Sequence, residues 1–245
     1  MLFVSVQRLI LALWVPCLVL SAAATHADER HVGLWSGLVT VDAVSEPASA
    51  RPDEPTPAAG EMSFPLLLHV DPQGRISLLK EATLLWRQGE TAQDGQYVLV
   101  ADPKVLARLL AETAGSPSGR RLSTAAVDFE GAALPMRGDL APGKVAWVTV
   151  EVPADLPTNP FRHPYHPDHD NRGEDGSALP EGHEEVFVVT RQIELAFDDA
   201  SIEAGSAPAL EGRYRETLTG LHRRPLVVSG RVSLRRAAAI PLIEH

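Results

Sequence analysis

Side chains that could bind a metal ion are concentrated in one stretch of this chain, from Asn159 to Asn171. Its thirteen positions hold three histidines, two aspartates, two asparagines and three prolines. Neutral imidazoles together with carboxylates suit zinc, manganese or iron, whereas oxygen ligands alone suit calcium. Prolines restrict the backbone, which reduces the entropy lost when ligands are held in place. The pattern therefore predicts a divalent metal site with the candidate ligands His163, His166, Asp168, His169 and Asp170.

The same composition is also typical of a loop that binds no ligand. Asp and Asn side chains can hydrogen-bond to their own backbone in turns, and proline stiffens such a loop further. In either interpretation Asn159, Tyr165 and Asn171 support the loop. His222, in the turn before the last strand, is either a further member of this site or an exposed turn residue, and we favour the exposed turn residue. Metal binding and simple capping of the fold both remain open.

The elements that position this loop begin after residue 27. An apolar run from Leu9 to Leu20, followed by small residues, predicts a signal peptide at 1–27, because it is shorter than the roughly 20 residues of a membrane-spanning helix. The single cysteine, Cys17, lies within this run, so the remaining chain cannot form a disulfide and needs a sizeable apolar core. A net charge of -10 with scattered basic residues argues against nucleic acid as a partner. The chain is not expected to be an integral membrane protein.

Alternation of apolar and polar side chains predicts half-buried strands along most of residues 28–245. Two of them, Phe64–Val70 and Ile76–Trp86, are expected to form a hairpin around the turn at Asp71–Gly74. Asp102 and Pro103 are typical of a helix start, and they predict one short helix. Further strands are expected at 34–44, 97–101, 122–129, 144–152, 187–197, 214–219 and 226–234, with a flexible excursion at 45–61 and His69 on a solvated strand face.

This pattern predicts an all-β fold, an antiparallel β-sandwich or open barrel of about 8–10 strands with one short helix. Predicted strands and helices do not alternate along the chain, so a parallel sheet is not expected. We expect one domain at 28–245, with the long His-, Asp- and Pro-containing loop at 153–184 interrupting its strands.

Two charged residues interrupt otherwise apolar strand faces. Arg191 shares its face with Val189 and Ile193, and Glu216 shares its face with Tyr214 and Leu218. If the two strands are neighbours, an ion pair would satisfy both charges, because an unpaired buried charge costs several kcal/mol. We interpret them as a structural ion pair, with a ligand-binding role as the alternative.

Several blocks of the sequence form a recognisable set: Gly33–Gly37, Phe64–Gly74, the Asn159–Asn171 stretch with its Tyr-His-Pro-Asp-His-Asp-Asn run, Thr190–Gln192 and Tyr214–His222. Together they resemble the signature of an uncharacterised β-rich domain in large exported bacterial proteins. The resemblance spans about Gly33 to Arg236. It implies a secreted bacterial domain, in some cases a module of a longer protein, and it implies no established activity, ligand or catalytic residue.

The sequence therefore predicts an exported, non-enzymatic module for binding or assembly at the bacterial cell surface or in the periplasm, with other cell-envelope domains or proteins as partners. The alternative is a metal-dependent hydrolase that uses the His163–His169 loop, with zinc, manganese or calcium as the possible metal. Removal of the metal by a chelator would distinguish the two functions. The hydrolase would lose turnover, whereas a binding module would keep its activity unless the metal is structural.

Overall fold

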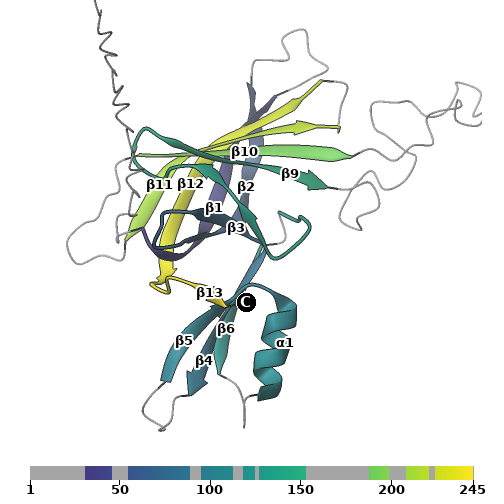
Figure 1. The fold of residues 1–245 in the computed structure, drawn as a ribbon. Coiled ribbons are helices and arrows are strands. Elements are labelled where there is room, and N and C mark those ends of the chain that lie inside the picture. Colours follow the sequence, from purple (N-terminus) through teal and green to yellow (C-terminus); the bar gives the residue numbers. More distant parts are fainter. Residues whose placement is uncertain are drawn as a thin grey trace, which may run out of the picture.

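The computed structural model describes residues 31–45, 55–88, 95–112, 118–124, 127–152, 188–198, 208–220 and 224–244. Most of these residues lie in β-strands, and the one helix among them is short. The all-β class predicted from the sequence is confirmed, in the form of an antiparallel, nearly closed sheet (Figure 1). No helix in the described part of the chain is long and apolar enough to cross a membrane.

The described residues form two sheets. The larger contains nine strands, and each pairs antiparallel with its neighbours. They are β1 (Gly33–Ser45), β2 (Pro55–Val70), β3 (Ile76–Leu79), β7 (Ala133–Pro135), β8 (Arg137–Gly138), β9 (Val145–Val152), β10 (Val189–Phe197), β11 (Ala209–Thr219) and β12 (Leu226–Ala238). Their spatial order is β7-β3-β2-β1-β12-β11-β10-β9-β8.

The two edges of this sheet meet, which makes it a nearly closed barrel. The outermost strands β7 and β8 are separated in the chain by Met136 alone, so the sheet must curl until its edges lie beside each other. The backbone N–H of Met136 donates to the carbonyl of Ile76 at 2.8 Å, and its side chain lies in the barrel core. Gly230 helps the curl, because a Cβ there would lie 2.1 Å from the carbonyl oxygen of Thr40 on the next strand.

The smaller sheet has the order β13-β5-β4-β6 and hangs below the barrel in Figure 1. Its strands are β4 (Glu81–Gln88), β5 (Gly95–Val100), β6 (Gly119–Ser123) and β13 (Ile243–Glu244), and β13 pairs parallel with β5. The helix α1 (Pro103–Glu112) packs on one face, where its Val105 and Leu109 join a small apolar core. As predicted, Asp102 caps this helix, since its Oδ1 accepts the N–H of Lys104 at 2.8 Å.

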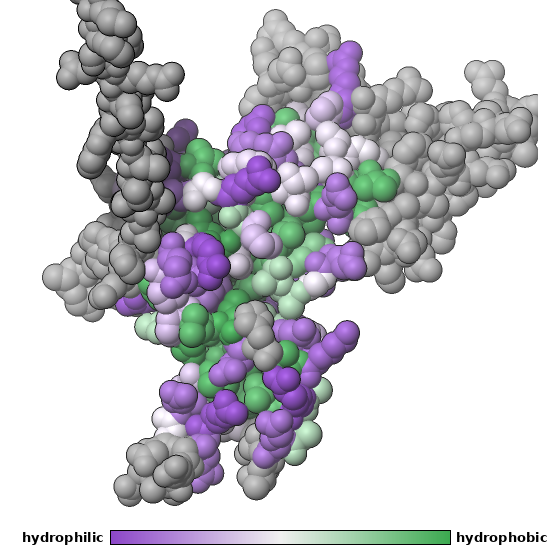
Figure 2. Space-filling view, viewed as in Figure 1, coloured by the Kyte–Doolittle hydropathy of each residue, from purple (hydrophilic) through white to green (hydrophobic). Residues whose placement is uncertain are grey.

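The buried apolar side chains of the described ranges form three cores. The largest fills the barrel and includes Trp35, Leu66 and Phe197. A second core joins the outside of the barrel at Leu34 and Leu67 to the small sheet and the C-terminal residues after β12. Figure 2 shows hydrophobic residues between the barrel and the small sheet, and hydrophilic residues scattered over the surface of both. The third core lies under α1.

Four details of the predicted strands are wrong. The stretch 76–86 is not one strand, because the chain leaves the barrel after β3 and enters the small sheet as β4. The predicted excursion at 45–61 contains the start of β2, which extends the pairing with β1 to Ser45. The strand expected at 122–129 already ends at Ser123. The described residues also form thirteen strands instead of 8–10, four of which have four residues or fewer.

His69 is buried, with 3% of its surface exposed, and the prediction of a solvated side chain is wrong. It lies on the outer face of the barrel, as the alternation indicated, but the second core and the C-terminal residues cover that face. Its Nε2 lies 3.1 Å from the carbonyl oxygen of Ile240. Because a carbonyl only accepts, Nε2 is the protonated nitrogen.

Candidate functional site

The predicted metal ligands lie outside the described residues. This holds for His163, His166, Asp168, His169 and Asp170, and also for Asn159, Tyr165, Asn171 and His222. The described residues contain no group of three or more potential metal ligands. The metal site stays a prediction, which elemental analysis of the protein beside a variant with the three loop histidines changed to alanine would test.

The described residues do place both ends of the long loop. Val152, the last residue of β9, and Val189, the first residue of β10, are register partners in the barrel. Arg191 follows one pleat further along β10 on the same face. The buried charges predicted from the sequence are therefore near the end of the barrel where residues 153–187 begin and end.

Arg191 and Glu216 form an ion pair inside the barrel. The pairing is diagonal across the neighbouring strands β10 and β11, in which Arg191 is opposite Leu218 and Glu216 is opposite Ile193. The guanidinium Nε donates to Glu216 Oε1, and the hydroxyl of Tyr214 donates to Glu216 Oε2 at 2.7 Å. Only 15% and 4% of the Arg191 and Glu216 side-chain surfaces are exposed. One carboxylate thus satisfies two donors in an otherwise apolar core.

The surroundings of Arg191 and Tyr214 keep each of these two groups in one protonation state. Burial lowers the pKa of Arg191, but hydrogen bonding and attraction to Glu216 outweigh it, so that the pKa is raised. Burial and the Glu216 charge both raise the pKa of Tyr214 far above its ordinary value. The guanidinium therefore stays charged and the phenol stays neutral. Groups that neither gain nor lose a proton near neutral pH are suited to hold structure, not to transfer protons.

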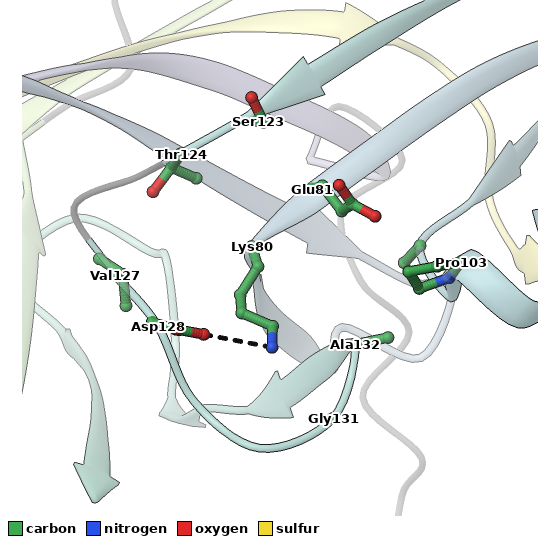
Figure 3. Close-up of a pocket in the computed structure, with 10 residues that line it drawn as sticks. Lys80, Glu81, Pro103, Ser123, Thr124, Val127, Asp128, Gly131 and Ala132 are labelled. Atoms are coloured by element: carbon green, nitrogen blue, oxygen red, sulfur yellow. Dashed lines mark ion pairs between the residues drawn. The ribbon is translucent and has the colours of Figure 1, made fainter. Parts of the chain in front are cut away.

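A pocket of about 320 Å³ lies where the barrel joins the small sheet. Figure 3 shows the side chains that line it, drawn from four parts of the chain: the β3–β4 connection, the start of α1, the end of β6 and the stretch before β7. Its polar lining consists of Lys80, Glu81, Ser123, Thr124 and Asp128, and its apolar walls include Ala101, Pro103, Val127 and Ala132. Small-molecule sites typically combine apolar walls with a few convergent polar groups.

Lys80 is the residue at which the chain changes sheets, between β3 and β4. Its ammonium donates to the carbonyl of Phe129 at 2.5 Å and lies 3.3 Å from Asp128 Oδ1, the pair marked in Figure 3. It also lies 5.2 Å from the centroid of the Phe129 ring, within the range of a cation–π contact. Lys80 therefore anchors the stretch before β7 to the sheet junction and places a positive charge in the pocket lining.

Thr124 continues the pairing of β4 with β6 by one residue, because its N–H donates to the carbonyl of Lys80 at 2.8 Å. Its side chain is 6% exposed, and its Oγ1 is a buried polar atom without a hydrogen-bond partner. Glu81, also in the lining, accepts hydrogen bonds from Arg121 on β6. The lining thus contains paired charges next to one unsatisfied hydroxyl group.

One sequence feature could have indicated this pocket. Ile76, Leu78, Ala82 and Leu84 continue one apolar alternation, and Lys80 is the charged residue in the middle of it. Such an interruption is the same signal that identified Arg191 and Glu216. The remaining lining residues come from coil and strand ends with no periodicity, so their convergence could not be predicted.

The chain matches no protein-family model and no curated protein. The resemblance to an exported bacterial β-rich domain consequently stays a prediction based on its own residues.

Proposed function

We propose that this chain is an exported, non-enzymatic β-module for binding or assembly at the bacterial cell surface or in the periplasm. We further propose that the pocket at the junction of barrel and small sheet is its ligand site. The apolar run Leu9–Leu20 and the small residues after it support export. The resemblance of the Asn159–Asn171 stretch supports a bacterial source.

One observation carries the assignment of the ligand site. The buried hydroxyl of Thr124 has no hydrogen-bond partner, and it lies in the lining of a pocket that also contains Lys80 and two carboxylates. A buried polar group without a partner costs free energy, roughly 1–3 kcal/mol, so folded proteins rarely keep one without a use. Oγ1 itself is shielded from solvent, so the side chain must first rotate about χ1, which exchanges the hydroxyl with the methyl group. A ligand in the pocket that then hydrogen-bonds to Thr124 would recover that cost on binding.

The chemistry of the lining favours binding over catalysis. The ammonium of Lys80 donates to the Phe129 carbonyl and pairs with Asp128, so it is engaged within the fold and not presented as a nucleophile. Glu81 is paired with Arg121. Charges that are held by each other fix the shape and polarity of a site, which is what selective binding needs.

Ligand mapping by NMR on the full chain tests the proposed site. We expect members of a small-fragment set to shift the methyl signals of Thr124, Val127 and Ala132 together. Ser123→Phe should abolish these shifts, because an exposed lining serine tolerates a large side chain that would occupy the pocket. The matched control, Ser233→Phe, changes an exposed strand serine outside the pocket lining and should keep them. Shifts scattered over the surface, or equal in the two variants, would overturn the site.

Export is tested separately by mass spectrometry of the protein recovered from an expressing bacterium. We expect a mature N-terminus directly after Ala24 or Ala27, following the two small-residue patterns there, in the periplasmic or extracellular fraction. A variant that starts at residue 28 should stay in the cytoplasm. Intact protein with residues 1–27 attached would contradict the proposal of a signal peptide.

A further inference from the structure

We infer that the junction pocket takes an uncharged ligand with neighbouring hydroxyl groups, of about the size of one sugar ring. This inference rests on the proposed function, since it names the ligand class of the same site. It follows from three properties of the lining: its balance of charge, its hydrogen-bonding groups and its volume.

The charged side chains of the lining balance each other. The lining carries one cation, Lys80, and two carboxylates, Glu81 and Asp128. Lys80 pairs with Asp128, and Arg121, next to the lining, pairs with Glu81, so two positive and two negative groups neutralise each other. A charged ligand of either sign would meet both attractive and repulsive groups and would have to give up its own hydration. An uncharged ligand avoids this cost.

The hydrogen-bonding groups then specify the kind of uncharged ligand. The hydroxyl of Ser123 can both donate and accept, and so can that of Thr124 once a rotation about χ1 turns it into the pocket. Lys80 can only donate, while the ionised carboxylates of Glu81 and Asp128 can only accept. Alcohol groups combine one donor with two acceptor lone pairs, so two neighbouring alcohols can satisfy donors and acceptors of this lining at once. A purely donating or purely accepting ligand would leave part of it unpaired.

Volume and walls limit the size of the ligand. About 320 Å³ is at the small end of the roughly 300–1,000 Å³ found for small-molecule pockets, which fits one ring and not a chain of rings. The C–H face of such a ring can pack on Ala101, Pro103 and Val127. None of the lining residues that the structure describes is aromatic, and the neighbouring Phe129 is 3% exposed beneath Lys80. Without a stacking platform, we expect binding in the millimolar range, on the order of -4 kcal/mol.

The test is an NMR titration of the full chain with three probes that share one ring: methyl glucoside, glucuronate and glucosamine. They are neutral, anionic and cationic at pH 7. We expect the neutral probe to shift the signals of Thr124 and Val127, and the two charged probes to bind at least about tenfold more weakly, which corresponds to 1.4 kcal/mol.

Two variants connect the binding to the unsatisfied hydroxyl. Thr124→Val keeps the shape of the side chain and removes the hydroxyl, and it should weaken binding of methyl glucoside about fivefold to tenfold. Thr124→Ser, the matched control, keeps the hydroxyl and should stay within about threefold of the unchanged protein. Unfolding curves for both variants verify that the fold is retained.

The possible outcomes separate the ligand class from the site. If a charged probe binds more tightly than methyl glucoside and Thr124→Val weakens it, the pocket stands as a site and the inferred ligand class is overturned. If methyl glucoside binds equally to both variants, or if its shifts lie elsewhere, the inference is overturned. If neither these probes nor the fragment set shifts the lining, the proposed function of the pocket fails with it.

Discussion

Two clusters of polar side chains are marked in the sequence by the same signal, a charged residue within an apolar alternation, but they differ in structure. In the barrel, Glu216 accepts hydrogen bonds from both Arg191 and Tyr214. At the junction, Lys80 is paired with Asp128, but the hydroxyl of Thr124 beside it has no partner. The first group is complete without a ligand, whereas the second has hydrogen-bonding capacity left over. The comparison shows that burial of polar side chains marks a site only where their hydrogen bonds are not already made within the fold.

The largest effect on the free energy of unfolding is expected from disrupting the cluster of Glu216, Arg191 and Tyr214 in the barrel. Glu216→Ala removes the carboxylate to which Arg191 and Tyr214 donate, and it should lower the free energy of unfolding by roughly 3–5 kcal/mol, because a buried charge loses its counter-ion. Urea unfolding curves measure the change. The double variant Arg191→Met with Glu216→Leu should recover most of the loss, since apolar groups of similar volume need no partner.

An exposed ion pair on the same sheet provides the control. Asp42 and Arg231 are 3.3 Å apart, with 46% and 72% of their side-chain surfaces exposed. Asp42→Ala should change the free energy of unfolding by less than about 1 kcal/mol, because water replaces the lost partner. A loss at Glu216 no larger than at Asp42 would mean that the cluster in the barrel does not stabilise the fold, and the contrast with the junction would disappear.

His69 offers a second contrast, since its burial favours the neutral imidazole over the charged one. Burial lowers its pKa below the ordinary value of 6.5, and the opposing effects of Ile240 and Asp71 are weaker. Between pH 6.5 and the lower folded pKa, the unfolded chain binds a proton that the folded chain does not. The free energy of unfolding should therefore fall as pH decreases through this window, by up to about 1.4 kcal/mol per pH unit.

The measurement is urea unfolding of the protein and of His69→Gln between pH 8 and pH 5. Glutamine keeps an N–H donor for the carbonyl of Ile240 but does not titrate. The difference between the two profiles isolates His69 from other titrating groups, and it should narrow as the pH falls. A constant difference over this range would show that burial does not disfavour the charged imidazole.

Lys80 is expected to contribute less than Glu216, because 30% of its side chain is exposed. Lys80→Met keeps the apolar stem and removes the bonds to Phe129 and Asp128, which should cost about 1–2 kcal/mol. Hydrogen exchange should also become faster in the stretch from Val127 to Gly131, which Lys80 anchors. Unchanged exchange there would contradict the anchoring role and leave the pocket wall without its main attachment.

Much of the barrel could be predicted because its long strands alternate cleanly. The strand expected at 144–152 is found at Val145–Val152, and the pairing of Arg191 with Glu216 followed from the faces that they interrupt. Closure of the barrel could not be predicted, because β7 and β8 have three and two residues and carry no periodicity. Their role depends on Met136 reaching Ile76, a contact between residues far apart in the chain.

The junction was missed for a related reason. Leu67 and His69 lie on the outer face of a barrel strand. The alternating sequence pattern predicts that side chains on this face are exposed to solvent, but a second sheet covers it. Two apolar residues on outer faces, Leu67 and Leu79, were the available signal that something packs there. The loop at Asn159–Asn171 is the reverse case, a conspicuous pattern whose residues lie outside the described ranges, so its metal site remains a prediction from sequence alone.

The smallest effect is also the one with an unusual sign. Thr124→Val should raise the free energy of unfolding by about 0.5–1 kcal/mol, because it replaces a buried hydroxyl that has no partner by a methyl group of the same shape. Thr124→Ser keeps the hydroxyl and loses a methyl group, so it should destabilise slightly.

Tyr214→Phe is the matched change in the barrel, where the hydroxyl does have an acceptor, and it should lower stability by about 1 kcal/mol. Opposite signs for the two hydroxyl deletions would mean that the fold retains Thr124 despite a cost to stability, which a ligand-binding role explains. Equal losses would mean that Thr124 is satisfied in solution, and the junction would then be as complete as the barrel.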